Sequence, residues 1–257
     1  MPDLRLSVGY RFCGVQMAVG GDVERSGVVV DIGQELGLRI VRGELKAGAR
    51  LPSVRALAVE YGVNVSTVQR VLVQMEERGL VRARPRSGVE VRDVDSVGMS
   101  SIWPLVMLDA RRQPERALAL LRDGLRCRRV LTLDLLPDLA GADAGRLEGL
   151  VDEFAEVVAA QAADLVVFDA ENRILVELLQ SVGRPAVLAV FNEVQQMIRS
   201  NDLLLSVIFA DRVATLSIWR GMLLAMESKH IEPALIGLAL EAFDERILHS
   251  FAERLGQ

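Results

Sequence analysis

Residues 51–93 have the sequence LPSVRALAVEYGVNVSTVQRVLVQMEERGLVRARPRSGVEVRD. Apolar residues recur at helical spacing in two short segments, and Gly62 lies between them, where a positive φ can end the first helix. Gly79 can end the second helix, and two short apolar runs follow it around a turn at residues 84–88. Two helices joined by a tight turn and followed by a hairpin are typical of proteins that place one helix in the major groove of DNA.

Serine side chains are predicted to begin both helices. Ser53 can cap the first helix and Ser66 the second, because a serine oxygen can accept a hydrogen bond from a free amide of the first turn. In the second helix, Val68, Val71 and Met75 recur at helical spacing. This helix is therefore expected to have one apolar side.

The spacing of several elements resembles the winged helix-turn-helix domain of the GntR family of bacterial transcription regulators. These elements are an upstream helix at about residues 29–42, Leu51-Pro52, Arg55, the Thr67-Val68 start of the second helix, and Gly88 in the hairpin. The second helix would then be the recognition helix and the hairpin the wing. The resemblance implies that the chain binds a double-stranded DNA operator and regulates transcription.

In that family, DNA is contacted from the first helix of the motif, the start of the recognition helix and the wing. At the matching positions we expect contacts from Ser53, Arg55, Ser66, Thr67, Gln69, Arg70, Arg84, Arg86 and Gly88. Arginine can contact guanine O6 and N7, and glutamine can contact an adenine edge, while hydroxyls and helix N-terminal amides can hold phosphates. For any single arginine, the alternative is a solvated helix face.

Residues 64–70, NVSTVQR, depart from one branch of the family. FadR-type members often have an arginine where this chain has Val65. The sequence of this segment is more similar to that of the YtrA-like branch. The operator of FadR-type proteins is therefore not expected for this chain.

The charge of the chain is unevenly distributed. The net charge of −5 over 257 residues argues weakly against nucleic acid. Residues 23–93, however, contain 12 Lys or Arg and 9 Asp or Glu, a charge of +3, whereas residues 94–257 contain 16 and 24, a charge of −8. Basic residues thus concentrate around the expected recognition helix and wing. Because +3 is only modestly basic, two copies are expected to be needed for useful affinity.

Four segments are expected along the chain. Residues 1–22 form an N-terminal extension, expected to be disordered, and residues 23–93 form the DNA-binding domain. A polar linker at residues 94–100 leads to an all-helical domain at residues 101–257. Prolines and glycines divide this last domain into about seven helices, near residues 101–112, 114–134, 144–160, 162–182, 186–209, 211–228 and 232–254. The fold class is therefore mainly α: a winged helix-turn-helix followed by a helical bundle.

Two local features bear on the helical assignment. Pro114, Pro185 and Pro233 each lie where a proline of the first helical turn is tolerated. Residues 165–168 are continuously apolar and could form a strand, but no partner strand is visible, so we favour a helix.

The helical part resembles, more loosely, the effector-binding domain of the FadR branch of the GntR family. The resemblance lies in residues 101–129 and 168–194, and includes Asp169, the turn SVGRP at residues 181–185, and Asn192. It implies a domain that forms a homodimer and binds a small-molecule effector.

Many GntR proteins with this domain bind a metal through three histidines and an acidic residue. By alignment the histidine positions are Arg173, Arg220 and Phe243 here, so we expect no metal. His230 and His249 fall elsewhere, and we expect them at the surface or at a helix end.

Arg173 and Arg220, with Asn192 and Phe243, make up the candidate effector site. The two arginines either point inward and hold an anionic effector or pair with acidic neighbours as structural bridges. An acyl-CoA, a fatty acid or an organic acid is the candidate effector. Residues 241–245 do not reproduce the stretch that FadR-type proteins use for acyl-CoA.

Other classes of protein are disfavoured. No run of 18 to 20 apolar residues indicates a membrane span, and the first 16 residues do not resemble a secretory signal. Cys13 and Cys127 do not suggest a disulfide framework, and with two histidines they are poor material for a zinc site. These features fit a cytoplasmic protein, associated with the nucleoid when bound to DNA.

The sequence as a whole predicts a homodimeric transcription regulator, expected to be a repressor, whose affinity for its operator responds to an effector in the helical domain. One alternative is a dimeric DNA-binding scaffold that needs no ligand. Another is an enzyme with a regulatory winged helix, which is disfavoured because no Ser/His/Asp set or glycine-rich phosphate loop is present. We therefore expect no enzymatic activity and no cofactor.

Overall fold

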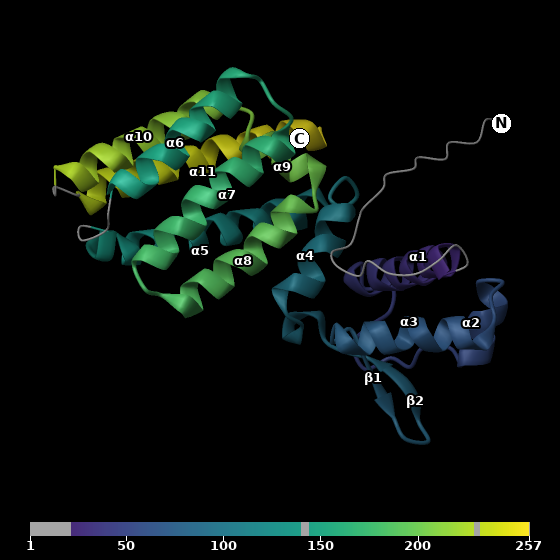
Figure 1. The fold of residues 1–257 in the computed structure, drawn as a ribbon. Helices are drawn as coiled ribbons and strands as arrows, with labels where there is room; N and C mark the ends of the chain where they lie inside the picture. The colour runs from purple at the N-terminus through teal and green to yellow at the C-terminus, as the bar shows by residue number, and fades with distance from the viewer. Residues whose placement is uncertain (1–21, 140–143, 229–231, 257) are drawn as a thin grey trace. The chain divides into compact units, whose positions relative to one another are not determined.

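The computed structural model describes residues 22–139, 144–228 and 232–256, which divide into two compact units (Figure 1). We call residues 22–113 the winged-helix unit and the described residues from 114 onward the helical unit. The structure is mostly helical with an N-terminal winged helix, which confirms the predicted fold class. Apart from Asp22, the extension predicted at residues 1–22 lies outside the described residues.

The winged-helix unit combines helices with one antiparallel hairpin. Its elements are α1 (Asp22–Val41), α2 (Val54–Glu60), α3 (Val65–Glu77), β1 (Val81–Arg84), β2 (Gly88–Val91), the 3-10 turn η1 (Val94–Ser96) and α4 (Met99–Leu108). The two strands pair from Val81 opposite Val91 to Arg84 opposite Gly88. Residues 85–87 therefore form the turn of the wing.

Local signals explain where α2 begins and where α2 and α3 end. Ser53 caps α2, as predicted, because its Oγ accepts a hydrogen bond from the amide of Ala56 at 3.2 Å. Gly62 and Gly79 have φ angles of 63° and 74°, a left-handed conformation that lets the chain leave each helix.

The apolar side of α3 forms part of a core with α1, α2 and β1. In α3 the buried residues are Thr67, Val68, Val71, Leu72 and Met75, and α3 packs against α1, α2 and β1. The predicted apolar side is thus confirmed. This packing holds α3 with its opposite face exposed.

The helix α4 packs on α1 and belongs to the winged-helix unit. At Gly37 the two helices approach so closely that an added Cβ would lie 2.9 Å from Cδ1 of Leu105. Arg42, just after α1, also hydrogen-bonds to Asp109, the residue that ends α4. Along the chain, the division between the two units falls between α4 and α5, whereas residues 94–100, predicted as the linker, include η1 and belong to the winged-helix unit.

The helical unit consists of α-helices only, within the residues that the structure describes. They are α5 (Pro114–Leu139), α6 (Ala144–Ala159), α7 (Asp164–Ser181), α8 (Pro185–Arg199), α9 (Asp202–Ile208), α10 (Arg212–Glu227) and α11 (Pro233–Leu255). Pro114, Pro185 and Pro233 begin helices as predicted, and residues 165–168 lie within α7 rather than in a strand. None of the helices described in either unit has the length and apolar character needed to cross a membrane.

One predicted helix of this unit is two helices. The sequence predicts a single helix at residues 186–209, but α8 ends at Arg199 and α9 begins at Asp202. Asn201, which is 4% exposed, separates them because its side-chain oxygen accepts a hydrogen bond from the amide of Leu204 at 3.0 Å. Such local capping competes with helix continuation.

Candidate nucleic-acid interface

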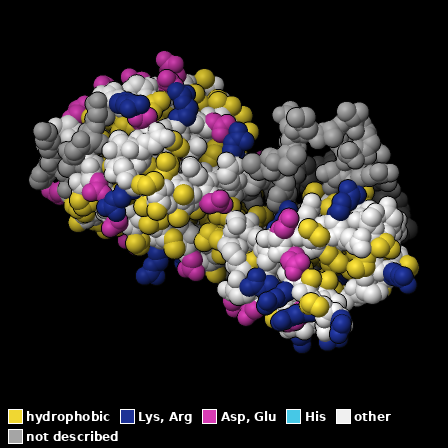
Figure 2. Space-filling view, turned by 60° about the horizontal axis from the view of Figure 1, so that its bottom comes forward, with side chains coloured by type: hydrophobic (Ala, Val, Ile, Leu, Met, Phe, Trp, Pro, Cys, Tyr) yellow, Lys and Arg dark blue, Asp and Glu magenta, His cyan; other side chains and the backbone are white. Residues whose placement is uncertain are grey.

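The exposed face of α3 carries three of the residues predicted to contact DNA. Ser66, Gln69 and Arg70 are exposed, whereas Thr67 is only 6% exposed and lies at the edge of the core. Figure 2 shows Lys and Arg side chains gathered on the surface of the winged-helix unit, with hydrophobic side chains between them. A helix with a polar outer face beside basic side chains is suited to a DNA groove.

Asn64, and not Ser66, caps the start of α3. Its Oδ1 accepts hydrogen bonds from the amide of Thr67 at 2.8 Å, from the Thr67 hydroxyl at 2.8 Å and from the Ser66 hydroxyl at 2.7 Å. The predicted Ser66 cap is therefore wrong. Asparagine is as strong a cap as serine, so a capping side chain at either position fits the local pattern.

This arrangement changes what the two hydroxyls can do. A hydroxyl has one proton to donate, and Ser66 and Thr67 both donate theirs to Asn64. Phosphate oxygens only accept hydrogen bonds, so neither hydroxyl can bind a phosphate while this cap is intact. Their lone pairs can still accept hydrogen bonds from the amino groups of adenine or cytosine.

The two residues predicted on α2 are both at the surface. Ser53 is exposed, and its Oγ accepts from the amide of Ala56, which leaves its own proton available for a phosphate. Arg55, in the first turn of α2, is also exposed. Both side chains are therefore accessible to a nucleic acid.

The two arginines of the wing differ in their surroundings. Nε of Arg84 donates to Oε2 of Glu90 across the hairpin at 3.0 Å, so its charge is partly neutralised. Arg86 lies exposed in the turn with a φ of 61°, and Gly88 follows with a φ of 86°. Arg86 is therefore exposed in a left-handed backbone conformation that residues other than glycine rarely adopt.

Arg50 joins the wing, although the sequence did not single it out. Its backbone forms a β-bridge with Glu90, and its Nη2 lies 3.5 Å from Oγ of Ser87 in the wing turn. Its position directly before Leu51, at the start of the motif, is the sequence feature that could have pointed to Arg50.

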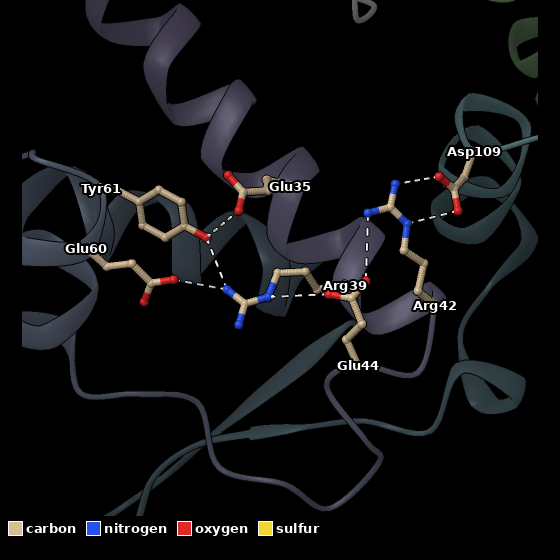
Figure 3. A network of polar contacts seen from close by, with 7 residues as sticks. All are labelled: Glu35, Arg39, Arg42, Glu44, Glu60, Tyr61 and Asp109. Atoms are coloured by element: carbon tan, nitrogen blue, oxygen red, sulfur yellow. Dashed lines mark hydrogen bonds and ion pairs between the residues drawn. The ribbon is translucent and has the colours of Figure 1, made fainter. Parts of the chain in front are cut away.

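A polar network ties α1 to α2 and to the end of α4 (Figure 3). Nη1 of Arg39 donates to Glu60 at 3.1 Å, and the Tyr61 hydroxyl lies between Arg39 and Glu35. Burial raises the pKa of Tyr61, so its hydroxyl stays protonated and donates to Glu35 at 3.3 Å. This network orients α2, and with it Arg55, on the core helix α1.

The candidate effector residues of the helical unit do not come together. Arg173 is exposed and pairs with Glu153 of α6 at 2.5 Å, which corresponds to the structural bridge rather than to the inward-pointing alternative. Arg220 and Asn192 are exposed as well, whereas Phe243 is buried. Of the two alternatives, the one in which both arginines point into the bundle is not observed, because their positions on α7 and α10 face solvent.

A different set of polar groups lies partly or fully buried in the helical unit. Glu171 accepts a hydrogen bond from the indole of Trp219 at 3.0 Å, and burial raises the pKa of its carboxyl. Arg128 donates to Asp244 at 2.6 Å and lies over the ring of Phe243, 5.3 Å from its centroid. Sequence spacing did not reveal this set, because its members come from four different helices.

Three buried atoms in or beside this set lack a hydrogen-bond partner among the residues described. They are Nε of Arg128, Oδ1 of Asn172 and Oδ2 of Asp244, which has only an ion pair with Arg129 at 3.4 Å. Buried polar atoms normally find partners, so one donor and two acceptors mark this part of the bundle as unsatisfied. A polar molecule bound there could supply the missing partners.

The part of the chain that the structure describes contains no cluster of three or more His, Cys, Asp or Glu arranged to hold a metal ion. His249 is 77% exposed and pairs with Glu253 at 3.3 Å, which agrees with its predicted place at the surface. His230 lies outside the described residues.

Comparison with known proteins identifies the first domain. Residues 29–91 match the model of the bacterial regulatory proteins of the gntR family. The uncharacterized HTH-type transcriptional regulator YhcF of Bacillus subtilis is 36% identical over 66 residues, which are 26% of this chain and 54% of YhcF. YjiR of Escherichia coli, another uncharacterized HTH-type regulator, is 46% identical over 50 residues, 20% of this chain and 11% of YjiR. The chain thus matches about half the length of one relative and about a tenth of the other.

Solved structures are similar over more of the chain but at lower identity. GntR of Streptococcus agalactiae has a TM-score of 0.43 at 20% identity, and covers 86% of this chain and 99% of its own. McbR/YncC of E. coli has a TM-score of 0.41 at 16% identity, and covers 88% of this chain and 98% of its own. The family match at residues 29–91, together with the geometry of α2, α3 and the wing, shows that this chain carries a DNA-binding domain of the gntR family.

Proposed function

We propose that the protein is a homodimeric, sequence-specific transcription regulator that acts as a repressor on an operator of two half-sites. The observation that carries the proposal is the exposed polar face of α3 beside a basic wing, within a domain that matches the gntR family. Such a regulator would act in the cytoplasm, at the nucleoid. The assignment of its helical unit to the FadR branch is part of the proposal.

The charge of the DNA-binding segment supports the dimer. Residues 23–93 have a net charge of only +3, and affinity for DNA depends strongly on the number of phosphates neutralised. Two copies double that number. Two recognition helices about 34–36 Å apart would meet successive major grooves on one side of the duplex.

The effector would be a small anionic molecule, such as an organic acid, a fatty acid or an acyl-CoA, bound inside the helical unit. The unpartnered Nε of Arg128 supports this proposal, because a buried N–H of a guanidinium can donate to a carboxylate or phosphate. Arg173 and Arg220 are at the surface and do not support it.

Preferential binding to the folded state would raise the melting temperature of the protein, so a thermal-shift screen of these three classes of effector tests the proposal. No shift with any class would favour the ligand-independent scaffold.

Replacement of Arg55 tests DNA binding. Arg55→Ala should weaken binding to a selected operator about tenfold or more in a mobility-shift titration, because it removes one arginine contact. Arg122→Ala, which replaces another exposed arginine in the helical unit, on α5, is the matched control and should leave affinity unchanged. The dimer should persist in both variants on size-exclusion chromatography. Equal operator affinity of Arg55→Ala and wild type would exclude a DNA contact by Arg55.

A further inference from the structure

Two exposed valines lie on the face of α3 that carries Gln69. Val65, Gln69 and Val73 are spaced four residues apart, so they form one stripe along the helix. The valines are 42% and 55% exposed, and the stripe runs beside the buried face of α3. An apolar side chain is therefore part of the surface that would face the bases.

Val65 occupies the position from which a recognition helix reads bases. It is the first residue of α3, directly after the Asn64 cap, and the N-terminal residues of a recognition helix contact base edges. Three hydrogen bonds to Asn64 hold this turn in one conformation. A β-branched valine is also restricted at χ1, so its methyl groups have a well-defined direction.

The chemistry of base edges restricts what such a valine can meet. In the major groove the only apolar group on a base edge is the 5-methyl group of thymine. Opposite any other base, the valine would remove water from a polar edge without replacing the lost hydrogen bond. Val65 would therefore both favour thymine and disfavour the other bases.

We propose that Val65 determines specificity by contact with the 5-methyl group of one thymine in each half-site. The inference rests on the proposed function, because it concerns the bases that α3 reads.

The experiment that tests the inference removes only the 5-methyl group of thymine from the operator. Operators are first selected from a random duplex library with the full-length protein, and each thymine of the selected half-site is then replaced in turn by deoxyuridine. Because deoxyuridine lacks only the methyl group, one replacement should weaken wild-type binding about threefold to fivefold per half-site. Val65→Ala should lose this sensitivity at that position and bind both duplexes equally.

Val73→Ala is the matched control, because it makes the same substitution on the same exposed stripe two turns away. It should retain the sensitivity of the wild type at the thymine assigned to Val65. If wild-type binding is insensitive to deoxyuridine at every thymine, or if Val65→Ala keeps the sensitivity, the inference is wrong while the proposed function stands. If the selection enriches no sequence at all, the proposed function itself fails.

Discussion

Arg42, just after α1, donates two hydrogen bonds to the carboxylate of Asp109, the residue that ends α4. The Nε–Oδ2 distance is 3.0 Å, and Gln113 donates to the same carboxylate at 2.6 Å. The hydrogen bond from Arg42 lowers the pKa of Asp109, so this carboxyl is ionised at neutral pH. The pair joins α4 to the end of α1. The same helix packs against α3 and is hydrogen-bonded to α2 through Arg39 and Glu60.

Arg42→Ala should lower the free energy of unfolding of the winged-helix unit by about 3 kcal/mol, because it leaves the ionised Asp109 buried without its partner. Arg39→Ala, three residues earlier in the last turn of α1, should cost at most about 1 kcal/mol, because the carboxylates that Arg39 pairs with are largely exposed. Urea denaturation followed by the fluorescence of Trp103 in a Trp219→Phe background isolates this unit. Equal losses in the two variants would show that the Asp109 pair is no stronger than a surface pair.

The same pair shows what local sequence could and could not predict. The helices of the motif, the wing turn and the exposed arginines follow from spacing, glycines and caps within about 40 residues. The place of α4 depends on contacts between residues 67 positions apart, which no local pattern encodes. Likewise, Asn64 and Ser66 are both suitable caps, and only the three-dimensional structure shows which oxygen accepts the amide of Thr67. The buried set around Glu171 was unpredictable for the same reason.

Replacement of Asn64 should separate stability from DNA binding. Asn64→Asp keeps an accepting oxygen at the start of α3 and adds a charge that the helix dipole favours, so stability should be unchanged or rise by up to about 1 kcal/mol. The new negative charge at the DNA-facing end should nevertheless weaken operator binding by about tenfold. Asn64→Ala should instead lose about 1 kcal/mol of stability. Thermal unfolding and mobility-shift titration measure the two effects, and operator binding by Asn64→Asp as tight as that of wild type would place Asn64 away from DNA.

The native Arg86 should lower the free energy of unfolding and, at the same time, raise the affinity for DNA. Arg86→Gly relieves the cost of a left-handed φ, about 1 kcal/mol, and removes one positive charge from the wing. The variant should be more stable than wild type, yet the slope of log affinity against log salt should fall by about 0.9 per protomer. Arg86→Ala should show the same change of slope without the gain in stability, since alanine keeps the strain. A wild-type salt slope in both variants would mean that Arg86 contacts no phosphate.

The stability of the helical unit should fall as the pH rises from acid toward neutral. Burial raises the pKa of Glu171 above its ordinary value of 4.5, and the hydrogen bond from Trp219 offsets this only in part. Since the unfolded chain then releases this proton at lower pH than the folded protein, raising the pH above 4.5 favours unfolding until the folded-state pKa is passed.

Glu171→Gln tests this directly, because glutamine can still accept the hydrogen bond from Trp219 but cannot ionise. At pH 7 the variant should be more stable than wild type, because glutamine carries no charge to desolvate, and its loss of stability as the pH rises above 4.5 should be smaller than that of wild type. Denaturation followed by Trp219 fluorescence in a Trp103→Phe background gives the measurement. Glu148→Gln, at an exposed site on α6, should keep the wild-type pH dependence. A slope in Glu171→Gln as steep as that of wild type would assign the effect to another carboxyl, with Asp244 the next to replace, because burial raises its pKa as well.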